Sequence, residues 1–240
     1  MPNKWIPWVK VLVHAVCLLP FIDLYRTYKS GSLALLADPI NYITHQTGFW
    51  ALWLLVASLA VTPVRRLHPK LANLVRFRRL LGLYAFFYAT LHLATYVFLF
   101  SGYDVTAVWA GLKERHAGIV VDEWKQVWPT ILDDLKKRWF IQVGLGAYVI
   151  LLALAITSPA FVMRAMGGKA WRRLHWLVYI AGSAGITHWW LLVKTGVRAP
   201  APVTAVLFAL LLARVAWWAK EKLKKRRAAA ITAGAARAQV

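Results

Sequence analysis

Residues 78–100 read RRLLGLYAFFYATLHLATYVFLF, two arginines followed by a stretch without any Asp, Glu, Lys or Arg. A helix that crosses the hydrocarbon core of a bilayer needs about 20 mostly apolar residues. Basic residues commonly mark the cytoplasmic end of such a helix. The stretch therefore predicts a membrane-spanning helix over 80–100. Its histidine, His92, is an ionisable group inside the membrane, which is costly and so a candidate for function.

The composition of the whole chain agrees with a membrane protein. Of its 240 residues, 60% are hydrophobic and 16% are charged, and the mean hydropathy is +0.53. Soluble domains average about 45–50% apolar and about 25% charged residues, so a water-soluble globule is not expected. The net charge of +21 is better explained by basic residues that flank helices than by nucleic-acid binding. One cysteine, Cys17, allows no intrachain disulfide.

The same apolar pattern recurs and predicts an all-α integral membrane bundle of six transmembrane helices. The expected spans are 8–25, 46–64, 80–100, 139–157, 174–193 and 201–219. They form one expected domain over 1–220. The basic segment 221–240 is predicted to be a cytoplasmic tail that binds the headgroups of membrane lipids.

The segments between the spans fall into two sets of unequal charge. The N-terminus, 65–79, 158–173 and the C-terminal tail carry 20 Lys and Arg and one acid. The remaining connections carry 10 Lys and Arg and eight acids. By the positive-inside rule, the first set and both chain termini are cytoplasmic. We therefore expect a multi-pass membrane protein with both chain termini in the cytoplasm.

The longest connection, 101–138, is expected on the outer side. It carries Trp109, Trp124 and Trp128 among acidic and basic residues. This pattern is typical of an amphipathic segment that lies on the membrane surface. Together with 194–200, it is also a candidate surface for a partner that docks from outside.

Two histidines within the expected spans lie at nearly the same depth. His92 is 12 residues after the expected cytoplasmic start of its helix at Leu80, and His188 is 14 residues after Leu174. At 1.5 Å per residue, these depths are about 18 and about 21 Å, in the outer half of a core about 30 Å thick. Two neutral imidazoles that face each other in a bundle can bind one haem iron axially. His92 and His188 are therefore predicted iron ligands, and the aromatic residues that could line the haem are Tyr88, Tyr96 and Trp189.

A second haem site is less complete. His175 lies at the cytoplasmic mouth of the fifth span, 13 residues before His188, which is about 140° away around an ideal helix. The two histidines face different directions unless the helix is distorted, for which Gly182 and Gly185 are candidates. The residue of the third span that would face His175 is Arg78. Arginine does not ligate haem iron, but it could pair with a haem propionate.

Short motifs are spread in order over nearly the whole chain: Lys10 through His14 to Leu19-Pro20-Phe21, Asp38-Pro39, His45-x-Thr47-Gly48, Arg78-Arg79-Leu80-Leu81-Gly82-Leu83, Ala89-Thr90-Leu91-His92, Leu154-Ala155-Ile156-Thr157-Ser158, Arg172-Arg173-Leu174-His175-Trp176-Leu177-Val178-Tyr179 and His188-Trp189. These motifs resemble the MsrQ (formerly YedZ) family. That family is the haem-b membrane subunit of the periplasmic methionine sulfoxide reductase system MsrPQ, and it has a ferric-reductase-like transmembrane domain.

The resemblance implies an electron-transfer subunit of the bacterial inner (cytoplasmic) membrane that is not itself catalytic. Electrons from the respiratory quinone pool would pass through it to MsrP, a periplasmic molybdenum-cofactor reductase that repairs methionine sulfoxide in envelope proteins. Haem b is the implied cofactor, FMN is also associated with the family, and His92, His175 and His188 carry over as haem-linked positions. Related oxidases have two histidines on each of two helices. Arg78 replaces one of them here, which leaves a second haem open.

Two other functions stay open from the residues alone. One is a stand-alone transmembrane metalloreductase or oxidase, against which the lack of a recognisable flavin or nicotinamide domain argues. The other is a haem-free transporter or structural membrane protein, in which each histidine only hydrogen-bonds to a neighbouring helix. An absorbance spectrum of the reduced protein distinguishes these functions, because a b-type haem gives a characteristic spectrum.

Overall fold

The computed structural model describes residues 5–237, and the side chains of residues 5–229. Its elements, in chain order, are α1 (Ile6–Lys29), η2 (Ser32–Leu35), α2 (Pro39–Val64), η3 (Pro69–Leu74), α3 (Val75–Thr95), η4 (Tyr96–Phe100), α4 (Val105–Lys113), α5 (Gly118–Lys137), α6 (Trp139–Ile156), α7 (Ala160–Met166), α8 (Gly168–His175), α9 (Val178–Leu192) and α10 (Ala201–Arg237). The described residues contain helices and turns without strands, which confirms the expected all-α class.

Five helical segments of the described chain are long and apolar enough to cross a membrane: α1, α2, Pro69–Phe100 with α3 at its centre, α6, and Ala201–Ala229 of α10. They coincide with five of the six expected spans. The remaining one, 174–193, is interrupted, because α8 ends at His175 and α9 has 15 residues. Fifteen residues extend about 22 Å, which is shorter than a hydrocarbon core of about 30 Å. The sixth span stays a prediction.

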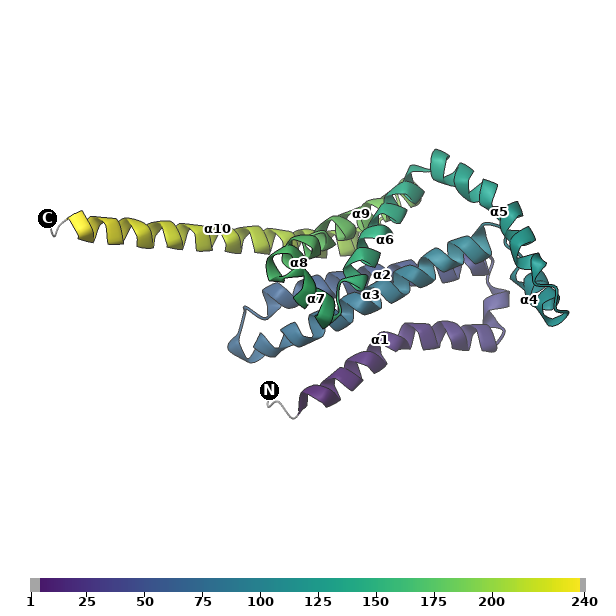
Figure 1. Ribbon diagram of the computed structural model, residues 1–240, viewed down its shortest axis with the longest axis horizontal. Coiled ribbons are helices and arrows are strands. Elements are labelled where there is room, and N and C mark those ends of the chain that lie inside the picture. Colours follow the sequence, from purple (N-terminus) through teal and green to yellow (C-terminus); the bar gives the residue numbers. More distant parts are fainter. Residues whose placement is uncertain (1–4, 238–240) are drawn as a thin grey trace.

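The connections gather at two ends of the bundle (Figure 1). The N-terminus, the α2–α3 connection and the α7–α8 pair lie toward the end from which α10 extends, whereas η2, α4 and α5 lie at the opposite end. This is the same division into two sets that the charges gave. With both termini toward one end, α9 runs back through the bundle between α8 and the start of α10. Which end is cytoplasmic stays a prediction.

The second helix lies at the centre of the packing. Of its most apolar window, 44% is buried, against 17% or less for the other candidate spans. Its buried residues Leu52, Leu55, Val56 and Leu59 belong to one apolar cluster. The other buried members, from α3, α6, α9 and α10, are Ala85, Leu151, Leu154, Val178, Ala181, Ile186, Val203 and Leu207. Helix α2 therefore sets the positions of the helices around it.

A proline in α2 creates a bonding requirement that the last helix meets. Pro63 has no N–H, so it cannot donate to the carbonyl of Leu59 four residues earlier. The guanidinium of Arg214 on α10 donates to that carbonyl from Nη2 at 2.7 Å, and its Nη1 donates to the Tyr179 hydroxyl on α9. An unsatisfied carbonyl is costly inside a membrane. Arg214, assigned by charge to the tail, thus joins α10 to α2 and α9.

In helix α1 as well, a side chain from another helix bonds backbone groups close to a proline. Helix α1 contains Pro20 and changes direction partway along its length (Figure 1), as proline commonly causes. The hydroxyl of Tyr88, on α3, accepts from the Phe21 N–H at 3.1 Å and donates to the Cys17 carbonyl at 2.8 Å. Cys17 and Phe21 are four residues apart, so the hydroxyl replaces one rung of the helix ladder. This inserted hydroxyl fixes α1 against α3.

The last helix passes through the expected domain boundary. Helix α10 continues without a break from Ala201 across residues 220 and 221 to Arg237. The basic tail expected over 221–240 is thus a helical continuation of the last span, and residues 238–240 lie outside the described residues.

Arg214 donates to the Leu59 carbonyl, which Pro63 leaves without its helical donor. We therefore predict that the effects of substitutions at Arg214 and Pro63 on the free energy of unfolding are not additive. Arg214→Leu removes both donors and should lower the free energy of unfolding. In a Pro63→Ala background, the new N–H supplies the Leu59 carbonyl, so Arg214→Leu should cost about 1 kcal/mol less than in the natural background. Unfolding in mixed detergent micelles measures the four free energies. Equal costs in the two backgrounds would show that the Leu59 contact contributes nothing.

Candidate functional site

The structure brings together the two histidines that were predicted to lie at equal depth. The ring centres of His92, on α3, and His188, on α9, are 6.0 Å apart, and the ring planes make an angle of 83°. Both side chains are partly buried. Residues that are 96 positions apart in the chain thus form one pair inside the bundle.

A backbone carbonyl fixes the orientation of each ring. The Nδ1 of His92 donates to the carbonyl oxygen of Thr44 on α2 at 2.9 Å. The Nδ1 of His188 donates to the carbonyl oxygen of Phe140 on α6 at 2.6 Å. A carbonyl oxygen only accepts, so each Nδ1 carries the proton of the neutral imidazole. Nε2 is then the nitrogen with a free lone pair, as a metal-ligating histidine requires.

Glycine makes both carbonyls accessible. Gly48 lies four residues after Thr44, and Gly144 lies four residues after Phe140. In an α-helix, the carbonyl of residue i points toward residue i+4, so a side chain at i+4 would obstruct an outside donor. A Cβ at Gly48 would lie 3.0 Å from Nδ1 of His92, and a Cβ at Gly144 would lie 2.7 Å from Nδ1 of His188. Each histidine ring occupies the space of the missing side chain.

The two halves of the site have the same construction. In one half, α2 supplies the carbonyl and the glycine and α3 supplies the histidine. In the other half, α6 supplies the carbonyl and the glycine and α9 supplies the histidine. The acceptor and the histidine are 48 residues apart in both halves. Sequence reasoning missed Thr44, Gly48, Phe140 and Gly144. The signal that could have found them is the pair of equal spacings, Gly48 to His92 and Gly144 to His188.

The three aromatic residues expected to line the site have different surroundings. The Tyr88 hydroxyl is bonded to the backbone of α1, so it is directed away from the histidine pair. The Tyr96 hydroxyl donates to Asp134 of α5 at 2.9 Å. Trp189 packs edge to face against His45 and Phe49, with ring centres 5.5 and 6.1 Å away.

His175 lies apart from the histidine pair. Its Nε2 is 3.2 Å from the Thr157 hydroxyl, and its ring stacks on Trp171 with centres 3.8 Å apart. The Arg78 guanidinium is close enough to interact electrostatically with this imidazole and with Arg214. Arg78 thus lies within electrostatic range of His175, and its pairing with a haem propionate stays a prediction.

The helix between His175 and His188 is distorted, but not at Gly182 or Gly185, the two residues considered as candidates for a distortion. The helix is interrupted at Trp176 and Leu177, between α8 and α9, whereas Gly182 and Gly185 lie inside α9. A Cβ at Gly182 would lie 3.7 Å from Leu59 and Leu207 side-chain atoms, and a Cβ at Gly185 would lie 3.3 Å from Leu52. Gly185 thus allows a close approach of α9 to α2, whereas a Cβ at Gly182 would make ordinary van der Waals contacts.

The side chains available as metal ligands distinguish a metal ion held by the protein alone from a haem iron. Over the described residues, no three or more His, Cys, Asp or Glu side chains gather closely enough to hold a metal ion. A protein-only metal site usually needs three or four ligands. A porphyrin supplies four ring nitrogens itself, so two axial imidazoles complete the iron. Fold and site together define a multi-pass helical membrane protein with a paired-histidine centre suited to haem.

Comparison with known proteins gives the family. A model of the ferric reductase like transmembrane component matches residues 47–186. A protein-methionine-sulfoxide reductase heme-binding subunit MsrQ from Xanthomonas oryzae pv. oryzae is 40% identical over 222 residues, covering 91% of this chain and 88% of the relative. A protein of the same name from Herminiimonas arsenicoxydans is 38% identical over 226 residues, covering 93% and 91%. The chain belongs to the MsrQ family. No solved structure matches it significantly.

Proposed function

We propose that this chain is the haem-binding membrane subunit of a protein-methionine-sulfoxide reductase, with one haem b held by Nε2 of His92 and Nε2 of His188. The observation that carries this proposal is the pair of carbonyl bonds at Nδ1. They orient both rings and leave both Nε2 atoms available. The names of the relatives support the cofactor and the reductase.

The spacing of the two rings fits one iron between them. A metal–imidazole bond is about 2 Å long and a ring centre is about 1 Å behind its coordinating nitrogen, so two histidines that would hold one iron between them need ring centres about 6 Å apart and both Nε2 atoms directed at the iron. The observed separation is 6.0 Å. Phe140, whose ring centre lies 6.1 Å from that of His188, suits the hydrophobic edge of a porphyrin.

Haem, when bound, supplies one-electron transfer. The protein's contribution is to hold two neutral imidazoles in fixed orientations and to keep water from the pair. Thr44 and Phe140 hold the ring protons at Nδ1, so neither histidine needs to exchange a proton with its surroundings. The site is therefore suited to conduct electrons without a coupled proton.

The position of the site supports a direction for electron transfer. His92 lies three residues before the end of α3, and His188 lies four residues before the end of α9. Both helix ends are at the end of the bundle that carries α4 and α5 (Figure 1), which is the predicted periplasmic side. We infer that electrons leave here to the periplasmic reductase MsrP, and that the respiratory quinone pool supplies them.

A second site is proposed around His175. It lies toward the predicted cytoplasmic end, where Arg78 supplies a cation that suits a propionate or another anionic group. We infer that this site takes part in electron entry or holds a second cofactor. A second haem and FMN stay predictions from the family resemblance.

The ligand assignment makes a prediction for histidine variants. His92→Ala and His188→Ala should each abolish the low-spin bis-histidine absorbance of the purified, membrane-inserted chain, because each removes one axial ligand. His14→Ala is the matched control, since this histidine is also intramembrane but bonds to the Tyr84 hydroxyl at 2.8 Å. His175→Ala should retain this haem. An unchanged spectrum in either His92→Ala or His188→Ala would contradict the assignment.

The electron path makes a separate prediction for the reconstituted protein. In proteoliposomes without oxygen, a quinol should reduce the haem, and active MsrP with methionine sulfoxide should reoxidise it. Omission of methionine sulfoxide is the control, because reoxidation then has no terminal acceptor. A haem that quinol does not reduce, or that stays reduced with active MsrP and substrate, would exclude this path. A metalloreductase or a transporter would then be the better function.

A further inference from the structure

The connection between α3 and α6 is built of two helices that are tethered to the membrane at both ends. Helix α4 and helix α5 follow the end of η4 at Phe100 and precede the start of α6 at Trp139. Helix α5 runs across the direction of the bundle helices, at the end of the bundle (Figure 1). Since a candidate span ends at Phe100 and another begins at Trp139, both tethers are at the same membrane surface.

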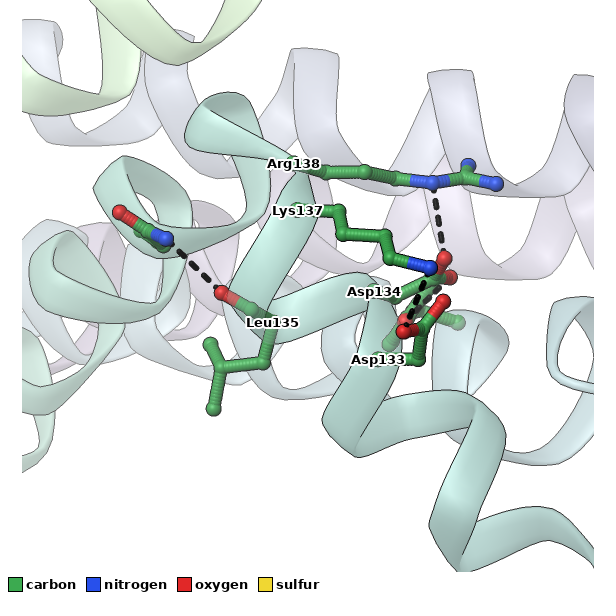
Figure 2. A network of polar contacts seen from close by, with 7 residues as sticks. Asp133, Asp134, Leu135, Lys137 and Arg138 are labelled. Carbon is green, nitrogen blue, oxygen red and sulfur yellow. Dashed lines mark hydrogen bonds and ion pairs between the residues drawn. The ribbon is translucent and has the colours of Figure 1, made fainter.

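Helix α5 separates apolar from charged residues. At 100° per residue, eight of its apolar side chains fall within an arc of about 140°; they are Val120, Val121, Trp124, Val127, Trp128, Ile131, Leu132 and Leu135. The charged residues lie outside this arc and pair among themselves. Lys137 is 2.8 Å from Asp133, and Arg138 is 2.8 Å from Asp134, as Figure 2 shows. The helix thus has one apolar face and one ion-paired face.

Only part of the apolar face is covered by the protein. Val127 is 4% exposed, whereas Val121, Trp124 and Trp128 are 54%, 39% and 46% exposed. On α4, Trp109 is 61% exposed. Tryptophan is enriched where a protein meets the membrane–water interface. The open part of the face therefore needs an apolar partner.

The open face is continuous with the lipid-facing surface of the third span. Phe98, at the end of that span, is 43% exposed. Aromatic rings lead from it onto α5 through contacts of Phe98 with Tyr103 at 5.4 Å, Tyr103 with Trp124 at 6.3 Å, and Trp124 with Trp128 at 5.8 Å. The apolar surface that meets lipid on α3 thus extends onto α5 without interruption. This continuity favours lipid as the partner of both.

The charge of residues 101–138 does not favour a charged partner over lipid. Residues 101–138 carry six Lys and Arg and six Asp and Glu. At the start of α4, the Thr106 hydroxyl and the Ala107 N–H lower the pKa of Asp104, which keeps this carboxylate charged. With no net charge, the segment has no long-range attraction for a charged partner or for anionic headgroups. Burial of apolar area is the available driving force.

We propose that α4 and α5 form an interfacial helix pair that lies in the outer headgroup layer of the bilayer. Trp109, Trp124 and Trp128 insert among the lipids, and the ion-paired face of α5 contacts water. Helix α5 is also bonded to the end of the third span, because Asp134 accepts a hydrogen bond from Tyr96, four residues after His92. The inference does not depend on whether haem is bound.

The test compares two labels on opposite faces of α5. Val121→Cys and Thr130→Cys are nine residues apart, which is about 180° around the helix. Both are made in the full chain with Cys17→Ala, labelled with an environment-sensitive fluorophore, and reconstituted in phosphatidylcholine vesicles. We expect blue-shifted emission at position 121, quenched by doxyl-labelled lipid and protected from iodide, with the opposite result at position 130. Raised salt should leave both unchanged, because the segment has no net charge.

Two outcomes would overturn the proposal. One is equal quenching by iodide at positions 121 and 130, which would place the apolar face in water. The other is a label at position 121 that iodide reaches in vesicles and that only added MsrP protects, which would make this face a protein docking site. Retained helical circular dichroism and a monodisperse elution profile for both labelled variants ensure that either outcome reports on a folded protein.

Discussion

The site depends on a hydrogen bond that an α-helix does not normally offer. A helical carbonyl already accepts from its own chain, and the side chain at i+4 usually covers its remaining lone pair. At Thr44 and Phe140, a glycine at i+4 leaves that lone pair open to a histidine from another helix. The bond fixes the ring, places the proton on Nδ1 and leaves Nε2 for a metal. Because the arrangement occurs twice, two histidines far apart in the chain come together with Nδ1 bonded to a carbonyl and Nε2 without a proton in each.

The rest of the bundle follows the same requirement that polar groups inside a membrane find partners within the protein. Pro63 frees a carbonyl, and Arg214 satisfies it from the last helix. Tyr88 bridges two backbone groups near Pro20 of the first helix. These contacts hold α1 and α10 against the pair of central helices α2 and α3. The histidine centre is thus enclosed by helices that are fixed to one another by polar bonds as well as by apolar packing.

Much of this architecture could be predicted from the sequence because its signals are local. Long apolar stretches predicted the five spans that the structure contains, and depth counted along the third and fifth expected spans put His92 and His188 at nearly the same level. Features that depend on contacts between helices could not be predicted this way. The break at Trp176 and Leu177 has no proline or glycine to mark it. Arg214 looked like part of a basic tail, because its partners lie on α2 and α9. The equal spacings from Gly48 to His92 and from Gly144 to His188 are visible in the sequence, but their meaning follows only from the contacts of the two histidine rings across the helix interface.

The most direct test of the carbonyl-and-glycine arrangement compares two glycines of α6. A Cβ at Gly144 would displace the His188 ring, whereas a Cβ at Gly146 would meet nothing within 4 Å. The measurement is the low-temperature electron paramagnetic resonance spectrum of the oxidised, haem-loaded protein, which depends on the orientation of the axial imidazoles. Gly146→Ala should retain the strongly anisotropic low-spin signal that near-perpendicular rings produce, and Gly144→Ala should shift or lose it. Should Gly144→Ala keep the natural signal at full haem content, the glycine does not position His188 and the account is wrong.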